Sequence, residues 1–112
     1  MKENRYYIDV ILEKEKIRNV KMQLSYKKRI EDLPKGGLVI RNINGKEYCY
    51  LRYREGNKII QKYAGKIENV DTIRSQIDER KHLLKLVHML EEEYERIKKM
   101  EGIKWSVIME VI

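Results

Sequence analysis

The pattern of apolar and polar positions divides the chain into two helical segments, a strand-rich segment between them, and an apolar C-terminal end. Residues 4–32 contain neither Gly nor Pro and are rich in Lys, Glu, Arg and Leu, a composition that favours a helix. Ile17, Val20 and Leu24 recur at helical spacing and predict its apolar face, which Ile8, Leu12 and Ile30 extend. Pro34 lies just beyond and predicts where this helix ends.

A second helix is predicted over residues 71–100. Asn69 or Asp71 can cap its first amides, and Gly102 follows its last turn. Its apolar residues follow one face, with charged residues opposite. The segment that follows, IKWSVIMEVI at residues 103–112, is too apolar to be left in water. It could add a fourth strand, fold over the helices or complete a dimer.

Between the helices the apolar period changes from helical to alternating, which predicts three strands. Asn44-Gly45 is a strong two-residue hairpin signal, because both central positions of a type I′ turn need positive φ. Glu55-Gly56-Asn57 is interpreted as a second, three-residue turn. The meander at 37–64 then gives one α+β domain over residues 1–112, of order helix, three-stranded antiparallel meander, helix and apolar tail.

The first turn fixes a register in which Ile43 faces Lys46, and alternation then sorts the side chains into two faces. One face is expected to be buried against the helices: Leu38, Ile40, Cys49, Leu51, Tyr53, Ile59 and Tyr63. The other is basic and aromatic: Arg41, Lys46, Tyr48, Tyr50, Arg52, Arg54, Lys58 and Lys62. This second face contains no acidic residue, although ordinary solvated strand faces mix both signs of charge.

Composition extends this picture. The chain of 112 residues has a net charge of +7 and a pI of about 9.4, which favours polyanions as partners. Cys49 is the only cysteine, so no intramolecular disulfide can form, and a reducing, cytoplasmic location is expected. No apolar run approaches the roughly 18 residues of a membrane span, so no membrane partner is expected.

Neither catalysis nor a cofactor is predicted. His82 and His88 are six residues apart, unlike the i, i+4 spacing of two zinc ligands on one helix. Cys49 falls on the buried face with no histidine nearby in sequence, so an inert thiol is expected. The glycines match no phosphate-binding loop, and the Glu91-Glu92-Glu93 run is interpreted as a solvated helix face rather than a metal site.

The segment LPKGGLVIRNINGKEYCYLRYREGNKIIQKYAGK resembles the tyrosine-rich meander of a group of small, mostly uncharacterised bacterial and archaeal proteins. A similar segment opens some transposases, and the meander is also similar in architecture to the DNA-binding sheets of some integrases. The resemblance implies a meander between two charged helices and a role beside a mobile element. The chain departs from the group at Ile60, where a lysine is typical.

The sequence therefore predicts a non-catalytic nucleic-acid-binding module that uses the basic face, with duplex DNA as its partner. Arg41, Lys46, Arg54, Lys58 and Lys62 are assigned to phosphates, with Arg52 and the tyrosines nearest the bases. The alternative is a protein interaction module, an inhibitor or adaptor, that acts through its long helices or the same sheet face. A homodimer is expected because the long amphipathic helices extend beyond a three-stranded sheet.

Overall fold

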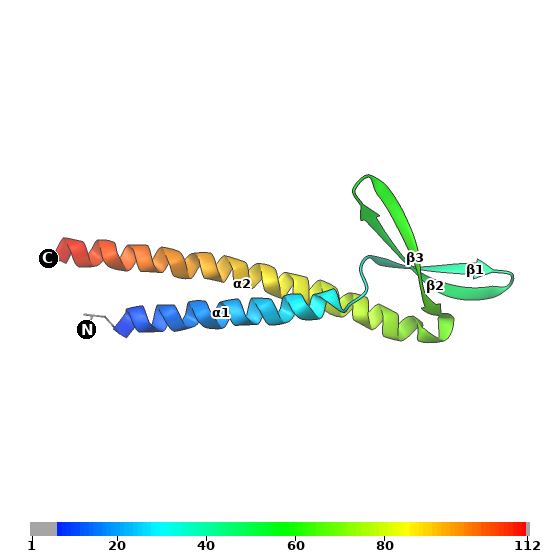
Figure 1. Ribbon diagram of the computed structural model, residues 1–112, viewed down its shortest axis with the longest axis horizontal. Coiled ribbons are helices and arrows are strands. Elements are labelled where there is room, and N and C mark those ends of the chain that lie inside the picture. Colours follow the sequence, from blue (N-terminus) through cyan, green and yellow to red (C-terminus); the bar gives the residue numbers. More distant parts are fainter. Residues whose placement is uncertain (1–6, 112) are drawn as a thin grey trace. The chain divides into compact units, whose positions relative to one another are not determined.

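The computed structural model describes the backbone of residues 7–111 and the side chains of residues 7–102. A helix is followed by three strands, a short 3-10 helix and a second helix (Figure 1). These elements form two compact units. The helix-pair unit consists of the described parts of residues 1–28 and 85–112, and the sheet unit consists of residues 29–84. The α+β class predicted from the sequence is confirmed.

The two long helices are α1, Tyr7–Glu31, and α2, Val70–Val111. A single turn of 3-10 helix, η1 at Ile67–Asn69, leads into α2. The predicted end at Gly102 is not observed, because α2 continues through this glycine and residues 103–111 are helical rather than a separate strand. One exposed glycine costs a helix only about 1 kcal/mol, which long flanking stretches of good helix formers can outweigh.

The strands β1 (Gly37–Ile43), β2 (Lys46–Glu55) and β3 (Lys58–Lys66) form an antiparallel sheet of order β1-β2-β3. Asn44 has φ 53° and Gly45 φ 84°, as a type I′ turn requires. The Asn42 side-chain oxygen accepts a hydrogen bond of 3.0 Å from the Gly45 amide. The predicted pairing of β1 with β2 is confirmed from Ile43 opposite Lys46 to Leu38 opposite Leu51.

The second hairpin differs from the prediction by one residue. Glu55 pairs with Lys58, so the loop contains only Gly56 and Asn57 rather than three residues. Gly56 has φ 62° while Asn57 keeps a negative φ, and a positive φ at the first loop position alone is typical of a type II′ turn. Because successive strand residues point to opposite faces, this slip places every side chain of β3 before Ala64 on the face opposite to the predicted one.

A β-bulge interrupts the pairing of β2 with β3. Cys49 pairs with Gly65 and Tyr50 with Tyr63, which leaves Ala64 as an extra residue. A bulge bends its strand and increases the local twist. In Figure 1 the two hairpin tips of the sheet unit point in different directions. The sheet is therefore three strands wide only at its centre, and each hairpin ends in a two-stranded arm.

The core of the sheet unit lies between β2 and the beginning of α2. Cys49, Leu51, Ile73 and Ile77 are buried together, and Leu38, Ala64, Ile67 and Val70 pack around them. Cys49 is fully buried, and its thiol contacts the Lys66 carbonyl oxygen at 3.7 Å. The predicted burial of Cys49 and Leu51 is thus confirmed.

A two-pronged ion pair joins the last turn of α1 to α2 within the sheet unit. Arg29 Nε and Nη2 donate to the two Glu79 carboxylate oxygens at 2.7 and 3.0 Å. The hydrogen bond from Arg29 is the main cause that holds the pKa of Glu79 below its ordinary value of 4.5. A lowered carboxylate pKa stabilises the folded state above the ordinary pKa, and this contribution disappears as the pH falls through the lowered value.

We therefore expect Glu79→Gln to lower the thermal midpoint slightly at pH 7 and by less at pH 3. The effect is small because both side chains are about half exposed and water screens their attraction. Thermal unfolding of both proteins at the two pH values measures it. Glu68→Gln is the control, since Glu68 is exposed and has no ion pair with any side chain of residues 7–102. A Glu79 effect of equal size at both pH values would contradict this assignment.

Candidate nucleic-acid interface

One face of the sheet points away from the core formed with α2. It is called the open face. The paired register assigns to it Val39, Arg41, Ile43, Lys46, Tyr48, Tyr50, Arg52, Arg54, Ile59, Gln61, Tyr63 and Lys66. Its charged side chains are all exposed, whereas Tyr48 and Tyr50 at the centre are half-buried. Six of the eight predicted site residues lie here: Arg41, Lys46, Tyr48, Tyr50, Arg52 and Arg54.

Lys58 and Lys62 do not belong to this face, and their predicted placement is wrong. Lys58 pairs with Glu55, and Lys62 pairs with the buried Leu51, so both lie on the face that packs on α2. Lys62 also lines a hollow of about 500 Å³ on that side, together with Leu33, Leu51 and Ile73. The predicted core-face positions of Ile59 and Tyr63 are wrong for the same reason. The shorter Gly56-Asn57 loop causes all four errors.

Four residues of β3 lie on the open face although the sequence did not predict them there: Ile59, Gln61, Tyr63 and Lys66. Gly56-Asn57 is itself a two-residue hairpin signal, and would have placed the first three correctly. Lys66 lies on the open face because of the bulge. The extra residue Ala64 shifts the alternation of side chains by one, so Lys66 pairs with Tyr48 and points to the same side. Gly65 inside an otherwise regular strand is the sequence signal of such a bulge.

Aromatic rings pack together at the centre of the open face. The Tyr63 ring lies edge-on to Tyr50 with centroids 5.7 Å apart, and is 6.3 Å from the Tyr48 ring. The Arg41 guanidinium lies 5.5 Å from the Tyr50 centroid and donates a 3.0 Å hydrogen bond to the Gln61 side-chain oxygen. These contacts link all three strands at the centre of the face, and the charged side chains around them are exposed.

All charged side chains of the open face are positive. It carries five cations, Arg41, Lys46, Arg52, Arg54 and Lys66. The two acidic residues of the strands, Glu47 and Glu55, belong to the opposite face. None of the five cations forms an ion pair with another side chain of residues 7–102. Five like charges on one small sheet repel one another, and an anion would relieve that repulsion.

Neither a metal cluster nor a membrane-spanning helix is found among the described residues. Within residues 7–102, no group of three or more His, Cys, Asp or Glu side chains could hold a metal ion. His82 and His88 are both exposed, and His88 lies 3.4 Å from Glu92 one helical turn away. In the part of the chain that the structure describes, no helix combines the length and apolar character needed to cross a bilayer.

The fold and the open face define a small α+β protein with a solvent-exposed, basic, tyrosine-centred antiparallel sheet. The family described as "Domain of unknown function (DUF6788)" matches residues 11–75, which is more than half of the chain, and the protein belongs to that family. The match includes most of α1, all three strands and the start of α2, so every open-face residue lies within it. No curated protein and no solved structure matches the chain.

Proposed function

We propose that this protein is a non-catalytic nucleic-acid-binding module whose open face binds duplex DNA. The observation that carries the proposal is the set of five exposed cations without a carboxylate among them. Lys and Arg side chains that neutralise phosphates supply most of the affinity of sequence-independent binding. The free thiol of the buried Cys49 suits the reducing cytoplasm. The similarity of the tyrosine-rich segment to the start of some transposases supports a role beside a mobile element.

The shape of the sheet favours a duplex groove. Neighbouring strands are about 4.8 Å apart, so each two-stranded arm is narrow enough for a major groove of about 12 Å, which admits a two-stranded ribbon. Lys46 lies on one arm and Arg54 on the other, so both arms bring a cation to the backbone. Arg52, between Tyr50 and Arg54 on β2, is the central cation that could reach a base edge.

The packing of the tyrosines favours duplex over single-stranded nucleic acid. Single-strand binders usually present ring faces on which bases stack. Here Tyr63 packs against both Tyr48 and Tyr50, and Arg41 covers the Tyr50 ring. Rings already engaged with one another offer less stacking surface, whereas their hydroxyl groups remain suited to hydrogen bonds with phosphate oxygens.

The proposal predicts that the affinity for duplex DNA falls steeply with salt and that the cations of the open face cause this dependence. If four or five open-face cations neutralise phosphates, log affinity for duplex DNA should fall linearly with log salt, with a slope of about −4. Replacing Arg54 and Lys66 by Ala should make the slope shallower by about 2 and weaken binding to all sequences alike. Fluorescence anisotropy of a labelled duplex, titrated at several salt concentrations, measures both quantities.

The matched control removes the same charge from the other face. Lys58 and Lys62 are exposed lysines on β3, like Lys66, but point to the opposite side. Their double replacement by Ala should change the slope far less than the loss of Arg54 and Lys66. Equal effects of the two pairs would show that only net charge matters, and no binding at ~50 mM salt would leave the protein interaction module as the remaining function.

A further inference from the structure

In the helix-pair unit, the side of α1 that meets α2 includes buried polar groups as well as apolar ones. Asn19 is fully buried there. Its amide nitrogen donates to the Leu90 carbonyl oxygen at 2.8 Å and to a Glu93 carboxylate oxygen at 3.1 Å, and its oxygen accepts from Gln23 at 2.7 Å. Lys16 forms an ion pair of 3.1 Å with Glu101 along the same seam. Leu12 is also buried, and Met22 and Tyr26 are half-buried beside Leu86 and Leu90, so the seam mixes polar with apolar contacts.

Three residues of the apolar face that the sequence predicted for α1 form a stripe on the outside, whereas Leu12 of the same predicted face is buried. Ile17, Val20 and Leu24 are 53%, 41% and 63% exposed, and they follow one another at helical spacing. Ile17 and Val20 also line a shallow groove of about 480 Å³ with Tyr94 of α2. A helix with one side packed on a neighbour and an aliphatic stripe on another is typical of an element with partners on both sides.

The charges beside the stripe complement another part of the same unit. Lys21 lines the groove on the α1 side beside Glu13 and Lys16, and it has no ion pair with another side chain of residues 7–102. On the same side α2 carries Glu91 and Glu95, whose exposed ion pairs with Lys27 and Lys98 are long, at 3.9 and 3.6 Å, and so contribute little. One chain thus carries both an unpaired lysine on α1 and two weakly paired glutamates on α2. A two-fold axis would place the lysine of each copy against the glutamates of the other copy. Such a surface is therefore suited to contact with a second copy of the same chain.

We propose that a second copy of this chain covers the stripe, so that the stripe of each α1 lies against the Tyr94 side of α2 in the other copy. If the two-fold axis runs parallel to the helices, each residue keeps the same position along that axis in both copies. Asn19 lies beside Leu90 and Glu93, so Lys21 of one copy lies level with Glu91 and Glu95 of the second copy. The result is an antiparallel four-helix arrangement.

The contact area is close to what a stable dimer requires. The 22 residues of α1 within the unit span about 33 Å at ~1.5 Å per residue, and a helix is about 10 Å wide. Each copy contributes two such contacts, one from α1 and one from α2, and so buries roughly 600–700 Å². A standard interface buries about 800 Å² per partner.

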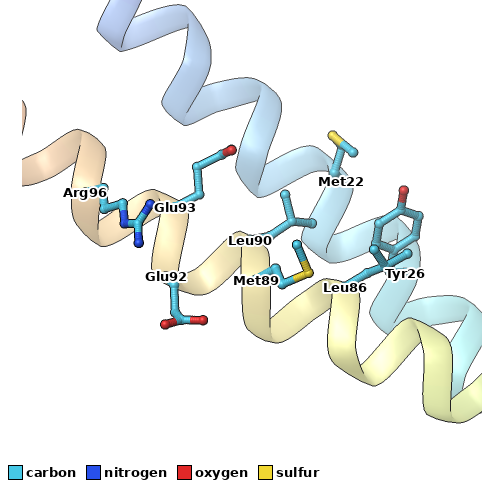
Figure 2. A pocket seen from close by; sticks show the side chains of 8 residues that line it. All are labelled: Met22, Tyr26, Leu86, Met89, Leu90, Glu92, Glu93 and Arg96. Atoms are coloured by element: carbon cyan, nitrogen blue, oxygen red, sulfur yellow. The ribbon is translucent and has the colours of Figure 1, made fainter.

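The opposite side of the helix pair provides a control position. A hollow of about 330 Å³ lies there. Figure 2 shows the side chains that line it, among them Met22 and Tyr26 from α1 and Leu86, Met89 and Leu90 from α2. Met89 is 61% exposed, much like Leu24. The charged residues that line this hollow, Glu92, Glu93 and Arg96, all come from α2, so no charged side chain of α1 is placed here to pair with α2 of a second copy.

Sedimentation equilibrium of the full chain tests the proposal. The wild type should have twice the mass of 13.6 kDa at tens of micromolar, whereas Leu24→Asp should raise the dissociation constant at least about tenfold. Met89→Asp should leave the dimer unchanged, and circular dichroism should show equal helix content in both variants. A monomeric wild type, or a dimer that survives Leu24→Asp, would overturn the proposal.

Charge reversal tests the arrangement itself. Lys21→Glu and Glu95→Lys should each weaken the dimer several-fold, and the double variant should recover most of the loss because it restores opposite charges. Additive losses in the double variant would show that the two side chains do not meet and would refute the two-fold arrangement. Neither experiment contains nucleic acid, so their outcome is independent of DNA binding.

Discussion

Replacing Leu51 by Ala is expected to destabilise the protein by about 2–5 kcal/mol, because the substitution opens a cavity in the sheet unit. Leu51 is 8% exposed and packs with Cys49, Ile73 and Ile77. These contacts attach β2 to the first turns of α2. Urea denaturation followed by circular dichroism measures the change in the free energy of unfolding.

Tyr48→Ala is the comparison for this variant, since Tyr48 is half-buried on the open face of the same strand. Its loss removes a ring contact with Tyr63 but leaves the core under β2 intact. The cost should be well below that of Leu51→Ala. A larger loss for Tyr48→Ala would mean that the open face, rather than the face on α2, carries the packing energy.

Gly36→Ala is expected to cost about 2–3 kcal/mol, because two independent penalties coincide at this glycine. Gly36 has φ +98°, a conformation that residues with a side chain rarely adopt. A methyl group there would also lie 2.5 Å from the Arg52 carbonyl oxygen and 2.9 Å from the Tyr53 Cβ. The backbone of β2 cannot move away without disturbing its pairing with β1.

The neighbouring glycine gives a matched control. A methyl group at Gly37 would meet no atom within 4 Å, and its φ is not in the positive region. Gly37→Ala should therefore be neutral or slightly stabilising, because Ala restricts the unfolded chain more than Gly does. Thermal unfolding of the two variants measures the difference. Equal stabilities would show that β1 can shift relative to β2.

The sequence predicted the parts of the fold that depend on local chemistry. Asn44-Gly45 allows one turn type, and this fixed the pairing of β1 with β2 and the faces of Arg41, Tyr48 and Leu51. The second turn was harder to predict, because Glu55-Gly56-Asn57 is compatible with loops of two or three residues. A choice between them decides the face of every following residue, so the error moved Lys58 and Lys62 to the wrong side.

The side of α1 that meets α2 could not be found from hydrophobic periodicity alone. The apolar period identifies Ile17, Val20 and Leu24 as one face, but it does not tell which partner covers that face. The seam instead contains Asn19, whose burial is compensated by hydrogen bonds to residues more than seventy positions away. Such compensation depends on tertiary structure, and no local signal in α1 announces it.

The two-residue turn at Gly56-Asn57 also bears on how this surface can evolve. Insertion of one codon in this loop would reverse the side-chain parity of the strand up to Ala64, so that Lys58 and Lys62 would exchange places with Ile59 and Tyr63. The face turned to solvent would gain two positive charges and lose an aromatic contact without any substitution in the strand. A single residue added to this loop would thus be enough to change a tyrosine-centred sheet into a lysine-rich one.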